Sequence, residues 1–193
     1  MRYQYRVFII ALALLLLTGT TVFADQAPTA ANPFGTSAKF SVDATAPTLS
    51  SVVATIEPRA DAPGYSWLRL HFYSFPPAAD DMAAIEAGDV ATLEKKREKL
   101  PQSDYNLSTA TLQFSVDKDF KVWQVDMSIP GQACTIAPYE KDVAKFLQSY
   151  KFDGKTLALK SKGTYACDMK FMKLPDAMYN WDLDLNVPVY AKK

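Results

Sequence analysis

The sequence is poor in the residues from which most catalytic and metal centres are built. It contains one histidine and two cysteines among 193 residues. Nucleophilic catalysis by a Ser-His-Asp or Cys-His set needs a histidine, and His71 falls in the middle of an expected strand, with no G-x-S-x-G motif in the chain. A zinc site is not expected either, because the chain has too few histidine and cysteine ligands. We therefore expect no metal, no cofactor and no nucleophilic active site.

The sequence also lacks a surplus of charge of either sign. Its 21 basic residues balance 21 acidic residues. A nucleic-acid-binding protein needs a clear basic surplus, because its side chains must neutralise phosphates. The charge balance therefore argues against nucleic acid as a partner.

Long apolar runs are scarce as well. The run from Val7 to Leu17 falls short of the roughly 20 residues that span a bilayer. Arginines at positions 2 and 6 precede it, and Val22-Phe23-Ala24 follows with small residues where a signal peptidase reads them. We expect a signal peptide over residues 1–24 and a flexible leader over residues 25–36. The mature protein is then exported, either periplasmic or secreted, without a membrane span.

The two cysteines of an exported chain are expected to form a disulfide. Export brings Cys134 and Cys167 into an oxidising compartment, where a bond between an even pair is the usual state. On the chain-entropy account, a loop of this length stabilises the fold by roughly 3–4 kcal/mol. No C-x-x-C motif points to redox chemistry or metal binding.

Alternating side chains around residues 106–134 predict an antiparallel hairpin at the centre of the fold. Apolar residues recur with period two, which is typical of strands with one buried face. The expected inward residues are Ala110, Leu112, Phe114 and Val116 on the first strand and Trp123, Val125, Met127 and Ile129 on the second. Asp117 to Asp119 form the turn between them.

Further strands are expected on both sides of this hairpin. They cover residues 39–43, 49–57, 65–75, 156–161, 164–173 and 179–190. The fifth of these follows a turn at Lys162-Gly163 and directs Cys167 inward. We expect one β-rich domain over residues 37–193.

Two segments have the composition of helices. Residues 78–100 are rich in Ala, Glu and Lys, and Gly88 divides them into two surface helices. A further short helix is expected from Pro138 to Tyr150. The predicted fold is mainly β: an antiparallel β-sandwich or curved barrel-like sheet of about seven to nine strands, with a two-helix insert and one further short helix.

One strand carries large side chains on both faces. Leu68, Leu70 and Phe72 form a sufficient core stripe, whereas Trp67, Arg69, His71 and Tyr73 alternate on the opposite face. An unpaired guanidinium is costly to bury, so Arg69 must reach water or an acid. We expect these four residues to form a ligand-binding face, unless the two-helix insert covers it.

The sequence therefore favours a non-enzymatic role. The leading hypothesis is an exported binding module that recognises a protein or a glycan through this aromatic and basic face. A carrier of a small apolar ligand inside the sheet is the alternative, which requires an internal cavity. A hydrolase that uses carboxylates alone is the third hypothesis, and it requires two acids across a cleft.

Overall fold

One curled sheet dominates the computed structural model, which describes residues 37–101, 109–137, 139–168 and 176–192. The predicted signal peptide and leader lie outside these residues. The nine strands are β1 (Ser37–Val42), β2 (Ser51–Pro58), β3 (Tyr65–Tyr73), β4 (Thr109–Asp117), β5 (Val122–Ile129), β6 (Gln132–Ala137), β7 (Ser149–Phe152), β8 (Thr156–Cys167) and β9 (Ala177–Ala191). The helices of the described residues are η1 (Ala79–Asp81), α1 (Met82–Glu86), α2 (Ala91–Glu98) and α4 (Glu140–Phe146). The prediction of a mainly β protein is confirmed.

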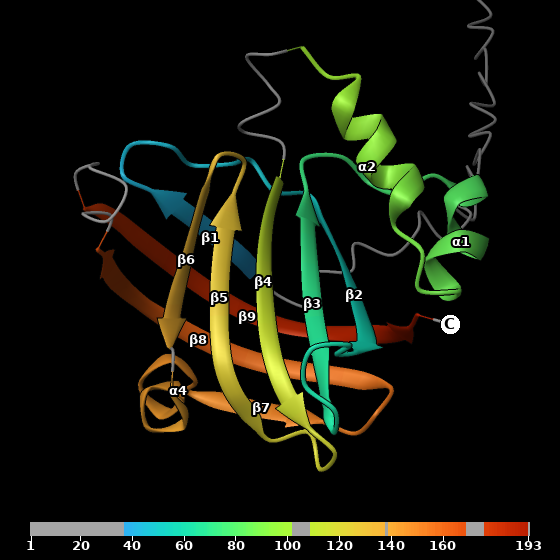
Figure 1. Ribbon diagram of the computed structural model, residues 1–193. Helices are drawn as coiled ribbons and strands as arrows, with labels where there is room; N and C mark the ends of the chain where they lie inside the picture. Colours follow the sequence, from blue (N-terminus) through green and yellow to red (C-terminus); the bar gives the residue numbers. More distant parts are fainter. Residues whose placement is uncertain (1–36, 102–108, 138, 169–175, 193) are drawn as a thin grey trace, which may run out of the picture.

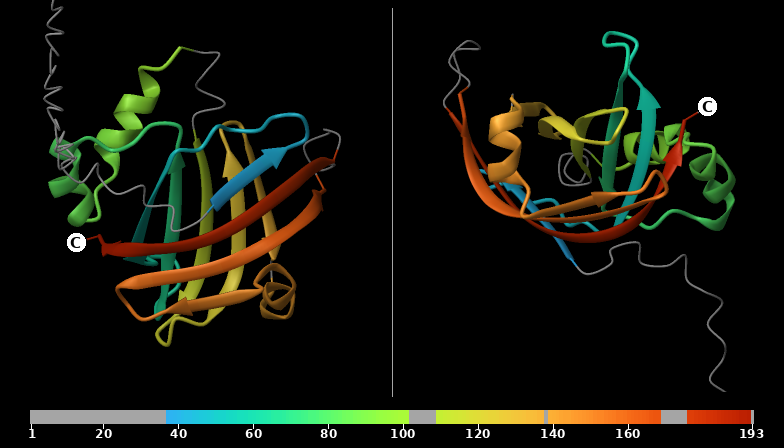
Figure 2. Two further views of the ribbon diagram at one scale, coloured as in Figure 1. Left: turned by 180° about the vertical axis from the view of Figure 1, so that it is seen from behind. Right: turned by 90° about the horizontal axis from the view of Figure 1, so that it is seen from below.

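The sheet is a half-barrel of mixed strand direction. Its order is β6-β5-β4-β3-β2-β9-β8-β7, and β1 pairs with β9 beside this path. In Figure 1, β3 to β6 stand upright in front, while β8, β9 and β1 run across them behind. Seen from below in Figure 2, the sheet curls around one interior. This shape agrees with the barrel-like alternative, and a sandwich of separate sheets is not observed in the described residues.

The prediction of a purely antiparallel sheet is wrong. β2 and β9 run parallel, with Ala54 opposite Val189. The remaining pairs are antiparallel, including β1 with β9 from Ser37–Asp184 to Val42–Tyr179. The same edge of the 15-residue β9 therefore pairs first with β1 and, further along the strand, with β2. Alternation along a strand reports which face is buried and carries no information about the direction of its neighbour.

Apolar side chains from both halves of the sheet fill its interior. Leu68, Leu70, Phe114, Val125 and Leu157 are all fully buried there. They belong to one continuous cluster that includes the inward residues of β8 and β9. The predicted inward direction is confirmed for Ala110, Leu112, Phe114 and Val116 on β4 and for Val125, Met127 and Ile129 on β5.

Trp123 is the exception, because a bulge changes its direction. Ser115 pairs with Gln124 and Val116 pairs with Val122, so the register shifts at Trp123. An extra residue in one strand breaks the period of two. The prediction that Trp123 points inward with Val125 is therefore wrong, and its half-exposed indole lies on the outer face.

Two predicted boundaries in the second half of the chain are also wrong. Lys162 and Gly163 form no turn, since β8 continues through them to Cys167. A side chain at position 163 would meet the ring of Trp181 at 2.7 Å, so glycine makes room for that indole. The helix expected to reach Tyr150 ends at Phe146, and residues 149–152 form β7 instead.

The two-helix insert is present and packs on the outside of the sheet. Ile85 of α1 and Leu93 of α2 are buried against Val53 of β2 and Tyr73 of β3. Gly88 separates the helices with a φ of 78°, and a β-carbon there would lie 2.5 Å from the backbone of Lys192. Glycine therefore permits both the turn and the close approach to β9. Of the helices in the described residues, none has the length and apolar character to cross a membrane.

A disulfide joins Cys134 of β6 to Cys167 of β8, as predicted. Their α-carbons are 6.0 Å apart, within the usual range for such a bond. β6 and β8 are not neighbours in the sheet order, so the bond links distant parts of the curled sheet. The disulfide is compatible with an oxidising compartment.

Candidate functional site

The four predicted ligand-binding residues share the outer face of β3, but they divide into two environments. Trp67, Arg69, His71 and Tyr73 all lie opposite the buried stripe of Leu68, Leu70 and Phe72. Tyr73 lies beneath α2 of the two-helix insert. Trp67 and Arg69 lie on the same strand, further from this insert. The face is therefore open at one end and covered at the other.

At the covered end of the face, burial shifts the pKa values of Tyr73 and His71. Tyr73 is 0% exposed, and its hydroxyl donates a hydrogen bond to Glu94 of α2 at 2.8 Å. Burial, with the nearby Glu94 carboxylate, raises the pKa of Tyr73. Burial also lowers the pKa of His71 to about 4, and the positive charges of Arg69, Lys192 and Arg97 add to the effect. Tyr73 thus holds the insert against the sheet, and the ring of His71 lies parallel to that of Tyr73, with centroids 6.5 Å apart.

Arg69 is partly open and has acidic and amide partners. Its Nε donates to Gln113 Oε1 at 2.6 Å, and its Nη1 forms an ion pair with Glu57. Glu57 also pairs with Lys192 at 3.1 Å. The Arg69 side chain keeps 27% of its surface exposed, so its head reaches both water and an acid, where the prediction required one or the other.

Trp67 is covered by a second arginine that the sequence analysis did not single out. The guanidinium of Arg59 lies 3.9 Å above the Trp67 ring, which is a close cation–π contact. Arg59 also donates to Ser115 Oγ at 2.9 Å and makes a two-point ion pair with Asp61. The Asp61 carboxylate raises the pKa of Arg59. Arg59 is therefore fixed between Trp67 and the neighbouring strand β4.

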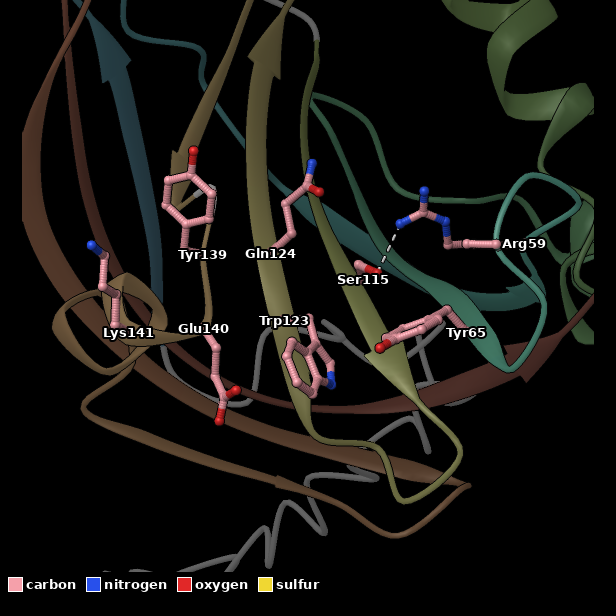
Figure 3. A pocket seen from close by; sticks show the side chains of 9 residues that line it. Arg59, Tyr65, Ser115, Trp123, Gln124, Tyr139, Glu140 and Lys141 are labelled. Carbon is pink, nitrogen blue, oxygen red and sulfur yellow. Dashed lines mark hydrogen bonds between the residues drawn. The ribbon is translucent and has the colours of Figure 1, made fainter.

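Beside Arg59, the outer face is hollowed into a cleft of about 690 Å³. The side chains around it come from the β2–β3 loop, β3, β4, β5 and the start of α4 (Figure 3). We call this the outer cleft, and its lining residues are Arg59, Ala62, Tyr65, Ser115, Trp123, Gln124, Tyr139, Glu140 and Lys141.

Three aromatic rings surround the outer cleft. Tyr65 and Trp123 meet edge to face, with ring centroids 6.1 Å apart. The Trp123 indole donates to Asp117 Oδ2 at 3.2 Å, which lowers the pKa of Asp117. Tyr139 is 64% exposed, a high value for so large a side chain. Trp123 and Tyr65 are thus held in place, while Tyr139 adds an open ring (Figure 3).

Polar groups lie between these rings. Ser115, Gln124 and Arg59 present hydroxyl, amide and guanidinium groups to the cleft. Gln124 Nε2 also donates to both carboxylate oxygens of Asp126, at 3.0 and 2.9 Å. Glu140 is neutralised by an ion pair with Lys121. The cleft therefore combines aromatic surfaces with fixed hydrogen-bonding groups, and Lys141 adds one positive charge 5.6 Å from the centre of the Tyr139 ring.

Acidic groups are scarce in the described lining of the outer cleft. Glu140 is the sole carboxylate among the described residues that line the cleft, whereas glycoside hydrolysis uses two. No group of three or more His, Cys, Asp or Glu that could hold a metal ion occurs in the described part of the chain.

None of the four predicted ligand-binding residues lines the outer cleft, and none of its nine lining residues was singled out from the sequence as a binding group. Four of these nine supply the rings and the fixed guanidinium of the cleft, namely Arg59, Tyr65, Trp123 and Tyr139. Tyr65 shares the alternation of Trp67 and Arg69, so the pattern could have included it. Trp123 was assigned to the core because the bulge cannot be inferred from simple alternation. Arg59 and Tyr139 lie in loops, where no period indicates a face. Comparison of the chain with protein-family models, curated proteins and solved structures finds no match.

Proposed function

We propose that this protein is an exported, non-enzymatic binding module that recognises a neutral glycan in the outer cleft. The observation that carries the proposal is the meeting of three aromatic rings with fixed polar groups in one open cleft. The proposed binding surface is therefore no longer the whole outer face of β3. It lies at the open end of that face and on the neighbouring strands.

Aromatic rings and hydrogen-bonding groups match the two kinds of surface on a sugar. A pyranose ring has an apolar C–H face that can lie on the indole of Trp123 or the ring of Tyr139. Its hydroxyls can exchange hydrogen bonds with Gln124, Ser115 and Arg59. Arg59 is fixed by Asp61 and Trp67, so little conformational entropy is lost when a ligand binds it.

The size and charge of the cleft favour a glycan over a protein partner. Its volume of about 690 Å³ falls within the range of roughly 300–1,000 Å³ that small ligands occupy. A stable protein–protein interface buries about 800 Å² on each partner, over a flatter surface. Arg59 is paired with Asp61 and Glu140 with Lys121. The remaining lining charge, Lys141, lies against the Tyr139 ring, so each charged lining group already has a contact within the chain.

Affinity electrophoresis against a panel of soluble polysaccharides tests the proposal. The panel contains neutral glucans, mannans, xylans and galactans, with an anionic polymer for comparison. We expect at least one neutral polymer to retard the wild-type protein. Trp123→Ala should reduce the affinity by about tenfold or more, because a buried aromatic contact is typically the main anchor of a site.

Tyr165→Ala is the matched control. Tyr165 is another exposed aromatic residue, but it lies on β8 and does not line the outer cleft. This variant should bind as the wild type does. Equal loss in both variants, or retardation by no neutral polymer, would count against the proposal.

A further inference from the structure

We propose that the mouth of the half-barrel, between the β4–β5 turn, α4 and β7, binds a small neutral apolar molecule. This mouth pocket is separate from the outer cleft, although Glu140 borders both. The inference uses different residues and does not depend on glycan binding.

The mouth pocket has the size and lining of a small-ligand site. Its volume is about 560 Å³, within the usual range of such sites. Most of its lining residues are apolar or aromatic: Phe120, Val122, Val143, Ala144, Leu147, Tyr150 and Phe152. In the view from below, the β4–β5 turn, α4 and β7 surround this end of the interior (Figure 2).

One residue of this lining, Tyr150, also carries a buried hydroxyl group. Tyr150 Oη is buried, and no group of the described residues forms a hydrogen bond with it. Burial raises the pKa of Tyr150, so the phenol remains protonated and able to donate. A buried hydroxyl without a partner is unfavourable, and a ligand with one polar atom would satisfy it once the side chains that cover the hydroxyl move aside.

Phe120 forms an aromatic wall of the mouth pocket, although its backbone conformation is unfavourable for a residue other than glycine. Phe120 has a φ of 61°, a conformation that favours glycine. Asp117 fixes this turn by accepting hydrogen bonds from the amides of Asp119 and Lys121, each at 2.9 Å. The strained residue places its ring 4.5 Å from that of Phe152, measured between centroids. A glycine would relieve the backbone but would remove this wall of the pocket.

The charges at the rim argue for an uncharged ligand. Asp119 and Glu140 face Lys121 and Lys151 around the pocket, so acid and base are balanced. Lys121 and Glu140 are already paired with each other. The Asp117 carboxylate lies close enough to raise the pKa of Tyr150 further, and it would repel an anion near that hydroxyl.

Fluorescence titration with N-phenyl-1-naphthylamine, a neutral aromatic probe that brightens in apolar surroundings, tests this site. The wild-type protein should show saturable binding. Ala144→Trp should weaken it at least tenfold, because Ala144 is exposed on α4 and the larger side chain fills the pocket. Tyr150→Phe keeps the ring and removes only the hydroxyl, so it should weaken binding about fivefold.

Two variants serve as controls. Ala166→Trp adds the same side chain at an exposed position on β8, and Tyr139→Ala removes an exposed ring that lines the outer cleft but not the mouth pocket. Both should bind the probe within twofold of the wild type. Probe binding that is absent from the wild type, or that is unchanged in Ala144→Trp, would overturn the proposal.

If Ala144→Trp fails to fold, amide chemical-shift mapping on the wild-type protein shows whether the probe binds in the mouth pocket. The probe should shift signals of residues 119–122 and 143–152. Shifts confined to other parts of the chain would overturn the assignment of the site.

Discussion

His71 makes the stability of this protein depend on pH. Its ring lies beside that of Tyr73 on the outer face of β3, with Thr55 Oγ1 3.3 Å from Nε2. Burial and the nearby charges of Arg69, Lys192 and Arg97 hold its pKa near 4, below the ordinary value of 6.5. Between these values the unfolded chain takes up a proton that the folded protein rejects. The free energy of unfolding therefore falls as the pH falls from 6.5 towards 4.

We predict that His71→Gln flattens this part of the stability profile. One pKa unit corresponds to ~1.4 kcal/mol, so His71 contributes at most about 3 kcal/mol of pH-dependent loss. Urea unfolding of both proteins at intervals from pH 7 to pH 4 measures the effect. Carboxylates contribute nearly equally to both profiles, so their difference isolates His71. Parallel profiles would show that His71 is not buried as described.

Single residues also show what the sequence could and could not reveal. Arg69 was expected to need water or an acid, and it has both, because it pairs with Glu57 and keeps a partly open surface. Tyr73 has the same alternation as Arg69, yet α2 covers it. Alternation assigns a side chain to a face, but whether a distant segment covers that face depends on tertiary packing.

At the scale of elements, one buried acid connects the two-helix insert. Asp81 is 4% exposed, pairs with Lys96 of α2 and accepts the amide of Ala78 at 2.8 Å. Lys96 lowers the pKa of Asp81, so the carboxylate remains charged. Together with the contact between Leu93 and Tyr73, this ion pair fixes α2 relative to η1 and the sheet.

We predict that Asp81→Ala loosens the insert without unfolding the sheet. Removing the acid leaves a backbone amide and the partly buried Lys96 without their partner, at a cost of about 2 kcal/mol. Amide exchange over residues 82–98 should therefore accelerate about thirtyfold, while exchange over residues 112–116 should not change. Hydrogen-exchange mass spectrometry measures both segments.

Lys95→Ala provides the control for this variant. Lys95 is exposed on the same helix, so its removal should leave exchange near the wild-type rate. Equal acceleration in both variants would mean that Asp81 has no special role in holding the insert. Acceleration throughout the sheet would mean that the insert is part of the global fold.

Elements with strict periodicity were predicted well from the sequence, and elements that break it were not. β4 alternates without interruption, and its predicted inward residues are all buried. β5 contains a bulge, so Trp123 faces outward. Gly163 resembles a turn signal, yet it lies within β8 to accommodate Trp181. Each error came from a feature that depends on the partner strand or on a residue distant in sequence.

At the scale of the whole molecule, the half-barrel has two separate hollows, to which we have assigned different proposed ligands. Its outer face carries the cleft of Tyr65, Trp123 and Tyr139, whereas its mouth opens between α4 and β7. The disulfide between β6 and β8 joins strands that are not hydrogen-bonded neighbours. Bonds of this kind typically stabilise a protein by about 2–4 kcal/mol. The sequence predicted a curved barrel-like sheet as one of two alternatives, but it could not reveal the parallel pairing of β2 with β9 within that sheet.

The three tryptophans allow the most direct test of the claim that the outer cleft binds a glycan. Trp123 lines the cleft, Trp67 lies behind Arg59, and Trp181 is buried with its indole donating to Ser161 at 2.8 Å. Each gives one indole N–H signal, which a Trp→Phe variant assigns. During titration with the best-binding neutral oligosaccharide, we predict a saturable shift of the Trp123 signal and an unchanged Trp181 signal. A titration that leaves Trp123 unchanged, or that shifts Trp181 alone, would contradict the claim.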